Sequence, residues 1–226
     1  MVASIIKNPH IDAILWDFGG VITSSPFEAF AHYEAQRGLP KNFIRTVNTH
    51  NPNDNAWAKL ERSEINAEEF STAFQREAVT LGHDVPGSAV LALLDGEVRE
   101  RMVTALATLK PLYKIACLTN NVRSGHGPAM NRSAKRAEKV ASVMSLFELV
   151  VESSKVGVRK PEPGFYLSAC ESLNINPKRA IYLDDLGINL KPARAMGMRT
   201  IKVVDPDNAL QTLSELLGHN VLPDSA

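Results

Sequence analysis

The chain has 226 residues, a length that suits one large α/β domain or a core domain carrying a smaller inserted one. Its 25 acidic and 25 basic side chains balance, so no net charge draws it to nucleic acid or to an anionic membrane surface. Cys117 and Cys170 lie in apolar sequence surroundings, which favours reduced, packed thiols over a disulfide framework.

The amino terminus lacks the charged start, long apolar middle and small-residue cleavage site of a secretory signal. No apolar run approaches the roughly 20 residues that a bilayer-spanning helix needs. We therefore expect a soluble, cytoplasmic protein that acts on a small molecule, with neither nucleic acid nor a membrane as its partner.

Five short apolar runs each end in polar residues, the pattern of strands that are covered on both faces of a parallel sheet. They span residues 13–17, 114–120, 148–153, 180–185 and 199–205. Helical patterns begin near residues 164, 189 and 208, and Gly218 ends the last of them. Strands that alternate with helices predict a doubly wound α/β sheet.

About 95 residues separate the first two predicted strands, far more than an ordinary crossover contains. Helical patterns occupy this segment at residues 26–37, 41–47, 55–60 and 67–81. We predict a helical cap domain at residues 24–95 and a core domain made of residues 1–23 and 96–226. Near the start of the second core segment a helical pattern, residues 98–109, returns the chain to the core, and residues 120–136 are predicted to form a loop.

Polar side chains stand at the predicted ends of three strands, the edge where open α/β sheets bind ligands. Lys160 lies just ahead of the helix that leads into the fourth strand. Carboxylates, a hydroxyl and an ammonium group at one edge indicate a site for Mg²⁺ and a phosphate group. The strand-end residues are Asp17, Thr119, Asn120, Asn121, Asp184 and Asp185.

This set of residues suggests a chemical route. In this route Asp17 attacks phosphorus and forms an aspartyl-phosphate. Hydrolysis then proceeds in two steps, formation and breakdown of this intermediate. Thr119 and Lys160 hold the equatorial phosphate oxygens, so that positioning and electrostatics supply most of the catalysis.

Four segments, "DFGGVIT", "CLTNN", "RKPEPGFY" and "YLDDLGINLKPARAMGM", occur in an order that resembles the haloacid dehalogenase (HAD) superfamily. They are most similar to the branch that includes the amino-terminal phosphatase domain of soluble epoxide hydrolases. The resemblance covers residues 11–205. It implies a Rossmann-like core with an inserted α-helical cap, Mg²⁺ as the cofactor, and a small phosphorylated substrate.

The resemblance also implies roles for individual residues. Asp17 is the expected nucleophile, and Thr119 and Lys160 are the other expected catalytic residues. The expected substrate-binding positions are Asn120, Asn121 and Gly20. The expected metal site contains Asp17, the backbone carbonyl of Gly19, Asp184 and Asp185, with Asp184 preferred over Asp185 as a ligand.

The first segment departs from the phosphatase pattern at Gly19. Phosphatases of the superfamily that the chain resembles usually read Asp-x-Asp at this segment. Their second aspartate protonates the leaving group and then activates water. Loss of a general acid and base removes a factor of about 10² to 10⁴ in rate. Phosphatase activity limited to certain leaving groups, or helped by another proton donor, is therefore the favoured interpretation; the loop histidines His50 and His126 are weak candidates.

Two alternatives remain open. In one, the protein binds a phosphorylated ligand or a partner with little or no turnover. In the other, Asp17 attacks carbon, as the resemblance to the dehalogenases of the superfamily would imply. Two features disfavour it: dehalogenases have a tyrosine where this chain has Gly19, and this chain keeps the "LDD" segment. Trp57 and Arg62 are candidates for substrate contact from the cap, although a core position for Trp57 and a solvated one for Arg62 are at least as consistent with the sequence.

Overall fold

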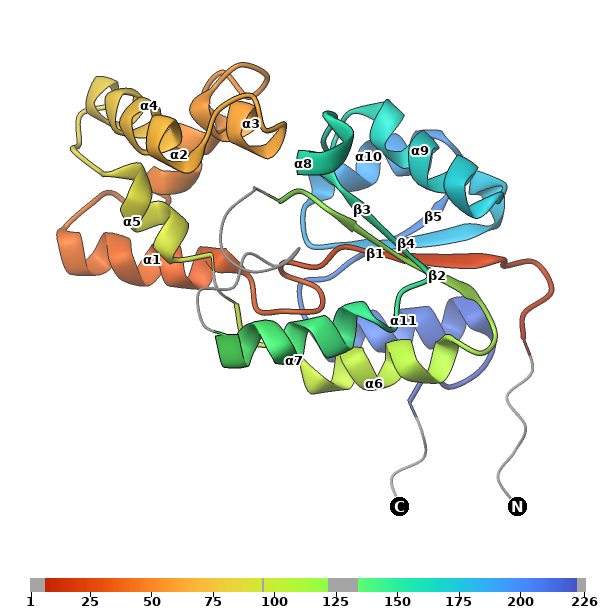
Figure 1. The fold of residues 1–226 in the computed structure, drawn as a ribbon. Helices are drawn as coiled ribbons and strands as arrows, with labels where there is room; N and C mark the ends of the chain where they lie inside the picture. The colour runs from red at the N-terminus through yellow and green to blue at the C-terminus, as the bar shows by residue number, and fades with distance from the viewer. Residues whose placement is uncertain (1–6, 95, 122–133, 223–226) are drawn as a thin grey trace.

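The computed structural model describes residues 7–94, 96–121 and 134–222. A parallel sheet has the strand order β3-β2-β1-β4-β5 (Figure 1). Each strand lies inside one of the five predicted apolar runs, so the predicted doubly wound α/β fold is confirmed. The strands are β1 (Ala13–Trp16), β2 (Lys114–Thr119), β3 (Leu149–Glu152), β4 (Ala180–Asp184) and β5 (Arg199–Lys202).

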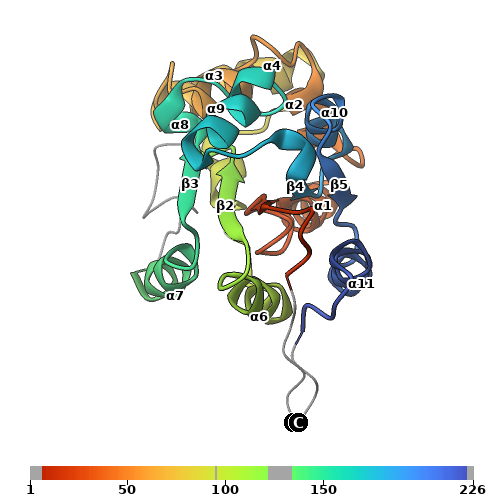
Figure 2. The same cartoon turned by 90° about the vertical axis from the view of Figure 1, so that its right-hand side faces the viewer.

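Helices cover both faces of the sheet, as Figures 1 and 2 show. One face carries α6 (Glu100–Leu109), α7 (Ala134–Met144) and α11 (Pro206–Leu217). The other carries α9 (Pro163–Leu173) and α10 (Gly187–Ala195).

Strand β1 shows why the predicted strands contain so few polar residues. Ile14 and Trp16 belong to the hydrophobic cluster on the α6 side of the sheet, whereas Ala13 and Leu15 belong to the cluster on the α9 side. All four are fully buried. Because alternate side chains of a strand point to opposite faces, a strand covered on both faces needs a continuous apolar run.

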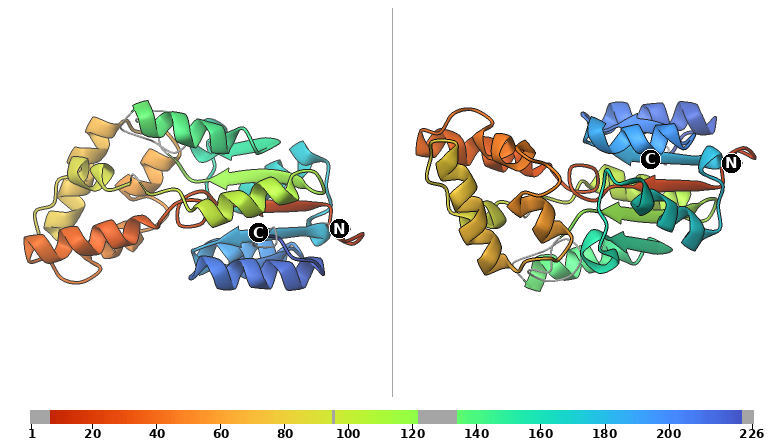
Figure 3. Two further views of the ribbon diagram at one scale, coloured as in Figure 1. Left: turned by 90° about the horizontal axis from the view of Figure 1, so that it is seen from below. Right: turned by 90° about the horizontal axis from the view of Figure 1, so that it is seen from above.

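Five helices follow β1 and pack around a hydrophobic cluster of their own, which includes Phe30, Phe70 and Phe74. Figure 3 shows them beyond the carboxyl ends of the strands. We call this group the cap. Its helices are α1 (Pro26–Arg37), α2 (Phe43–Thr49), α3 (Ala56–Glu61), α4 (Ala67–Thr80) and α5 (Gly87–Ala92).

The two chain segments that join the cap to the core run side by side. Thr23 and Val98 form an antiparallel bridge, and the Ser24 amide donates to the Glu97 carbonyl at 2.7 Å. The Glu97 amide donates back to Ser24 Oγ at 2.9 Å. The domain boundaries at residues 23/24 and 95/96 remain a prediction, and this paired connection lies beside both of them.

Among the described residues, three α-helices and the short 3-10 helix at Pro177–Arg179 were not predicted from the sequence. Helix α5 begins at Gly87, where an added Cβ would lie 2.7 Å from the Ser71 backbone, so close packing on α4 rather than local propensity forms it. Helix α7 begins at Ala134, inside the predicted loop of residues 120–136; residues 122–133 of that loop lie outside the described part of the chain. The short α8 (Ser153–Val156) directly follows β3. None of the described helices combines the length and apolar character that crossing a membrane requires.

Candidate active site

The sheet topology brings three strand ends together. Strand β1 lies between β2 and β4, with Trp16 in register with Cys117 and Leu183. Asp17, Thr119 and Asp184 therefore stand next to one another at the carboxyl edge, where the strand order reverses. The Asp17 amide donates to the Leu183 carbonyl at 2.8 Å and extends the pairing of β1 with β4 by one step.

Lys160 joins two of these carboxylates. Its Nζ lies 2.7 Å from Asp17 Oδ1 and 2.9 Å from Asp184 Oδ2, and its side chain is 1% exposed. Burial lowers the pKa of this ammonium group, but the two carboxylates outweigh burial and leave the pKa raised. Lys160 is therefore positively charged and forms ion pairs with both Asp17 and Asp184.

Asp184 is saturated with hydrogen-bond donors. Oδ1 accepts from the Leu186 amide at 2.8 Å and from Asn189 Nδ2 at 3.1 Å. Oδ2 accepts from Lys160, from Asn189 Nδ2 at 3.1 Å and from the Tyr182 hydroxyl. Because a carboxylate offers about four acceptor sites, Asp184 has little capacity left for a metal ion and instead anchors Lys160.

Asp185 has the opposite character. Its Oδ2 accepts a hydrogen bond from Ser25 Oγ at 3.2 Å, and its side chain faces the cavity described below. An added Cβ at Gly20, where φ is +80°, would lie 2.2 Å from this oxygen. These contacts leave Asp185 with more free acceptor capacity than Asp184, and the preference for Asp184 as a metal ligand stays a prediction.

Three carboxylates lie close together at this edge of the sheet. Oxygens of Asp17, Asp184 and Asp185 lie within 4.8 Å of one another. Burial is the main cause that raises the pKa of Asp17 well above its usual range, and the neighbouring carboxylates add to it. Burial and Asp184 likewise raise the pKa of Asp185 to about 6. A bound cation would offset this repulsion, and a set of hard oxygen ligands suits Mg²⁺.

The three residues at the carboxyl end of β2 have different surroundings. Thr119 is buried and faces the cavity. Asn120 brackets the backbone of Lys160: its Oδ1 accepts from the Lys160 amide at 2.8 Å, and its Nδ2 donates to the Lys160 carbonyl at 3.0 Å. Asn121 instead donates to Glu152 Oε2 at 2.6 Å and accepts from Ser154 Oγ at 2.9 Å, which ties β2 to β3.

A cavity of about 320 Å³ lies between the strand ends and the cap. Two of the predicted substrate-binding residues, Asn121 and Gly20, are not among the described residues that line it. We call its two sides the floor and the roof. The floor comprises Asp17, Gly19, Thr119, Asn120, Lys160 and Asp185, and the roof comprises Phe27, Phe30, Arg45, Asn48, Trp57 and Glu61.

Glu61 and Arg159 were not identified from the sequence. Arg159 Nε lies 2.5 Å from Glu61 Oε2, and both line the cavity. Arg62, the residue proposed instead, pairs with Glu64 at 2.5 Å and does not line it. Trp57 both lines the cavity and contacts the Phe70 ring, with 5.7 Å between centroids. Since Trp57 and Glu61 are four residues apart on α3, they share a helix face, and this spacing was the available signal for Glu61.

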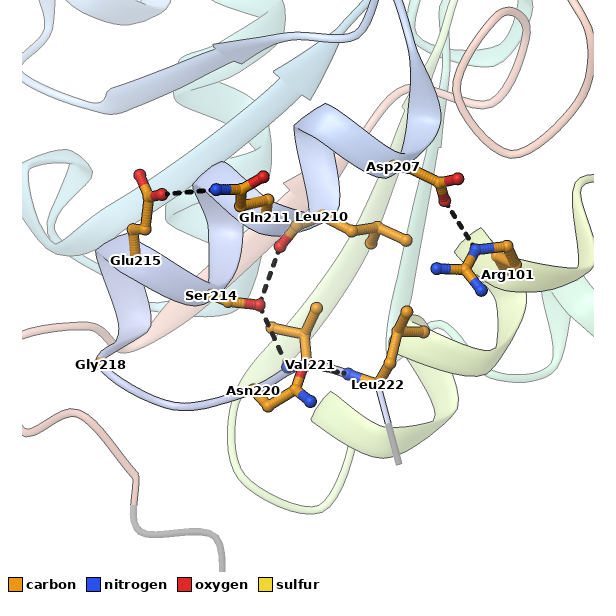
Figure 4. A pocket seen from close by; sticks show the side chains of 10 residues that line it. All are labelled: Arg101, Asp207, Leu210, Gln211, Ser214, Glu215, Gly218, Asn220, Val221 and Leu222. Carbon is orange, nitrogen blue, oxygen red and sulfur yellow. Dashed lines mark hydrogen bonds and ion pairs between the residues drawn. The ribbon is translucent and has the colours of Figure 1, made fainter. Parts of the chain in front are cut away.

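A larger hollow of about 510 Å³ lies beside α11 and is lined by residues of α6, α11 and the segment that follows α11 (Figure 4). Its polar side chains are paired with one another. Arg101 contacts Asp207 at 2.6 Å, and Ser214 donates to the Leu210 carbonyl and accepts from the Val221 amide. Among the described residues this hollow has no cluster of carboxylates around a cation, whereas the floor of the smaller cavity gathers carboxylates around one lysine.

The fold and the site together define a hydrolase with an α/β core and a helical cap. The sequence profile of the haloacid dehalogenase-like hydrolases matches residues 11–197, and the chain belongs to this family.

Relatives agree with this assignment. The chain is 31% identical over 212 residues to acyl-CoA dehydrogenase family member 10 of Mus musculus, covering 91% of this chain and 19% of that protein. It is 27% identical over 226 residues to bifunctional epoxide hydrolase 2 of Sus scrofa, covering 95% and 40%. The chain thus spans between a fifth and two fifths of these relatives' lengths.

Among solved structures, a HAD family enzyme of Bacteroides thetaiotaomicron in complex with magnesium and inorganic phosphate is similar in fold. Its TM-score is 0.56 at 21% identity, over 85% of this chain and 93% of that one.

Proposed function

We propose that the protein is a Mg²⁺-dependent phosphatase that hydrolyses a small phosphate monoester through an aspartyl-phosphate on Asp17. The proposal rests on the hydrogen bonding of the two carboxylate oxygens of Asp17. Oδ1 is held by Lys160 at 2.7 Å and by the Phe18 amide at 2.7 Å. Among the described residues Oδ2 has no hydrogen-bond donor, and the group lines the cavity. One oxygen is thus fixed and the other is available for attack.

The remaining floor residues then have distinct roles. Lys160 balances the charge of the phosphoryl oxygens, and the Thr119 hydroxyl donates to one of them. Asp184 and Asn120 hold Lys160 by its ammonium group and its backbone. Asp17, Asp185 and the Gly19 carbonyl would hold Mg²⁺, which supplies neutralisation of the phosphoryl charge. The magnesium and phosphate bound by the similar Bacteroides enzyme support this proposal.

The roof suggests the character of the substrate body. Phe27, Phe30 and Trp57 supply aromatic surface, and Ile188 lies at the cavity wall with 57% of its surface exposed. The roof also carries Arg45 and Asn48, whose buried Oδ1 has no hydrogen-bond partner among the described residues, so a phosphate ester whose body combines an apolar part with a polar group fits the cavity. We place the enzyme in the cytoplasm, and the free, buried state of both cysteines supports a reducing compartment.

A screen for phosphate release tests the proposal. The enzyme is offered diverse phosphomonoesters with Mg²⁺ or with EDTA, and Asp17→Asn serves as the blank. We expect Mg²⁺-dependent release that falls by about 10⁴-fold or more in the blank. Release that Asp17→Asn leaves intact, or that EDTA leaves intact, would contradict the mechanism.

A second function, binding of a phosphorylated ligand without turnover, is favoured by one observation, Gly19. The substitution Gly19→Asp separates the two functions, because an added Cβ there has no atom within 4 Å and the aspartate fits. A strong gain in hydrolysis would show that the remaining groups are competent. Phosphate binding by both forms, with hydrolysis by neither, would favour the binding function.

A further inference from the structure

The cavity contains one carboxyl group that the mechanism above does not use. Among the described residues that line it, the carboxyl groups are Asp17, Glu61 and Asp185, and there is no histidine, tyrosine or cysteine. Asp17 and Asp185 have roles in attack and metal binding. Among the described residues that line the cavity, Glu61 is therefore the remaining carboxyl group that is able to exchange a proton with a substrate; His126, the loop candidate, lies outside the described residues.

Glu61 enters from the side where a leaving group must lie. In phosphoryl transfer the attacking and leaving oxygens are roughly in line through phosphorus. With Asp17 attacking from the floor, the leaving oxygen points toward the roof. Glu61 is the last residue of α3, which faces the strand ends (Figure 1). Its Oε2 accepts from Asn120 Nδ2 at 3.3 Å, which places this carboxyl next to the floor.

The surroundings of Glu61 support a protonated form. Its residue is 6% exposed. Burial is the main cause that raises its pKa; Arg159, the Trp57 hydrogen bond and Lys160 oppose burial without outweighing it. Arg159 Nε is 2.5 Å from Oε2, yet its N–H does not point at that oxygen. Arg159 and Lys160 are the charged groups that face Glu61 from the core, and Asn120 and Trp57 are its polar neighbours.

We propose that Glu61 is the general acid and base of this enzyme, and that the cap thereby supplies the proton-carrying carboxyl that Gly19 lacks. The inference rests on the proposed phosphatase function. Asp17 attacks phosphorus, the bond to the leaving oxygen breaks with its electron pair on that oxygen, and Glu61 gives it a proton. Water then attacks the aspartyl-phosphate, Glu61 takes a proton from the water, and cleavage of the phosphorus–Asp17 bond releases phosphate.

The first test compares leaving groups. Values of kcat/KM are measured for aryl phosphates, whose leaving groups need no proton, and for alkyl phosphates, whose leaving groups do. We expect Glu61→Gln to lower alkyl phosphate hydrolysis by about 10²-fold and aryl phosphate hydrolysis by only a few-fold. The matched control is Glu64→Gln, which changes an exposed glutamate three residues along and should change neither. An equal loss for both classes, or no loss, would overturn the proposal.

Two further variants distinguish a loss of proton transfer from a loss of folding in Glu61→Gln. Gly19→Asp in the Glu61→Gln background should restore alkyl phosphate hydrolysis, because it returns a carboxyl to the floor. Arg159→Met removes a cation that lowers the pKa of Glu61, so the alkaline limb of the pH–rate profile should move to higher pH. Absence of both effects in folded variants would overturn the proposal. A wild type that releases phosphate from no ester would instead overturn the proposed function itself.

Discussion

The floor and the roof of the cavity are built in different ways. On the floor, Lys160 and Asn120 each make two or more hydrogen bonds or ion pairs, and Asp184, which lies directly beneath the floor and anchors Lys160, is almost completely buried with it. On the roof, Phe27 and Phe30 contact each other edge to face at 5.9 Å, and the prominent charged contact is that of Glu61 with Arg159.

This difference suggests that the floor carries out the reaction and that the roof selects the substrate. A hydrogen-bonded network such as that of Lys160, Asp184 and Asn120 holds one geometry, as positioning of a phosphoryl group requires. An aromatic wall contributes apolar contact that varies with the shape of the ligand. The floor is thus expected to determine whether hydrolysis occurs, and the roof is expected to determine which ester is used and, through Glu61, how its leaving group is protonated.

The largest effect is expected at Lys160. Lys160→Met leaves Asp17 and Asp184 buried without their cation, and breaking a buried ion pair in this way costs about 3–5 kcal/mol. Urea unfolding in EDTA measures this loss. The loss should shrink when the pH falls, because the raised pKa of Asp17 allows it to take up a proton and lose its charge in the folded state. Phosphate release should fall by at least about 10²-fold.

The control for this substitution is Lys155→Met. Lys155 forms an ion pair with Glu152 at 2.5 Å, but its side chain is 69% exposed, so its loss should cost less than about 1 kcal/mol. Equal stability of the two variants would mean that Lys160 does not stabilise the buried carboxylates of Asp17 and Asp184.

The next effect concerns the metal ligands on the floor. In Gly20→Ala the new methyl group collides with Asp185 Oδ2, which lies 2.2 Å from the Cβ position, so this carboxylate must move. We expect the Mg²⁺ concentration for half-maximal activity to rise about tenfold or more. Gly38→Ala is the control: φ is +65° there, close to the +80° of Gly20, and no atom lies within 4 Å of its Cβ position. An unchanged Mg²⁺ requirement in Gly20→Ala would remove Asp185 from the metal site.

The sequence predicted the floor better than the roof, for a physical reason. Strand ends follow from the apolar runs, so the positions of Asp17, Thr119 and Asp184 at one edge were predictable from local pattern and parallel pairing. The different hydrogen bonding of Asp184 and Asp185 was not, because it depends on Tyr182 and Asn189 reaching one carboxylate. The spacing between Trp57 and Glu61 indicates a shared helix face, but the contact of α3 with the segment before α9, about 100 residues away, brings Glu61 to the floor, and no local pattern encodes such docking.

The smallest expected effect lies on the roof, at Phe27. Its ring lines the cavity, and the Arg45 guanidinium packs over it at 5.0 Å from the centroid. Phe27→Ala removes apolar contact that a substrate makes equally in the ground state and the transition state. KM for esters with an apolar body should therefore rise about tenfold while kcat stays unchanged.

Tyr33→Ala is the matched control for Phe27→Ala. Tyr33 lies on the same helix α1 and packs against the cap cluster, but it does not line the cavity. Its loss should lower cap stability without changing KM, because no substrate atom meets it. If Phe27→Ala lowers kcat as strongly as it raises KM, the roof takes part in reaching the transition state, and the division between a reacting floor and a selecting roof has to be abandoned. If KM rises for every ester by the same factor, including the smallest, Phe27 holds the cap in place rather than the substrate body.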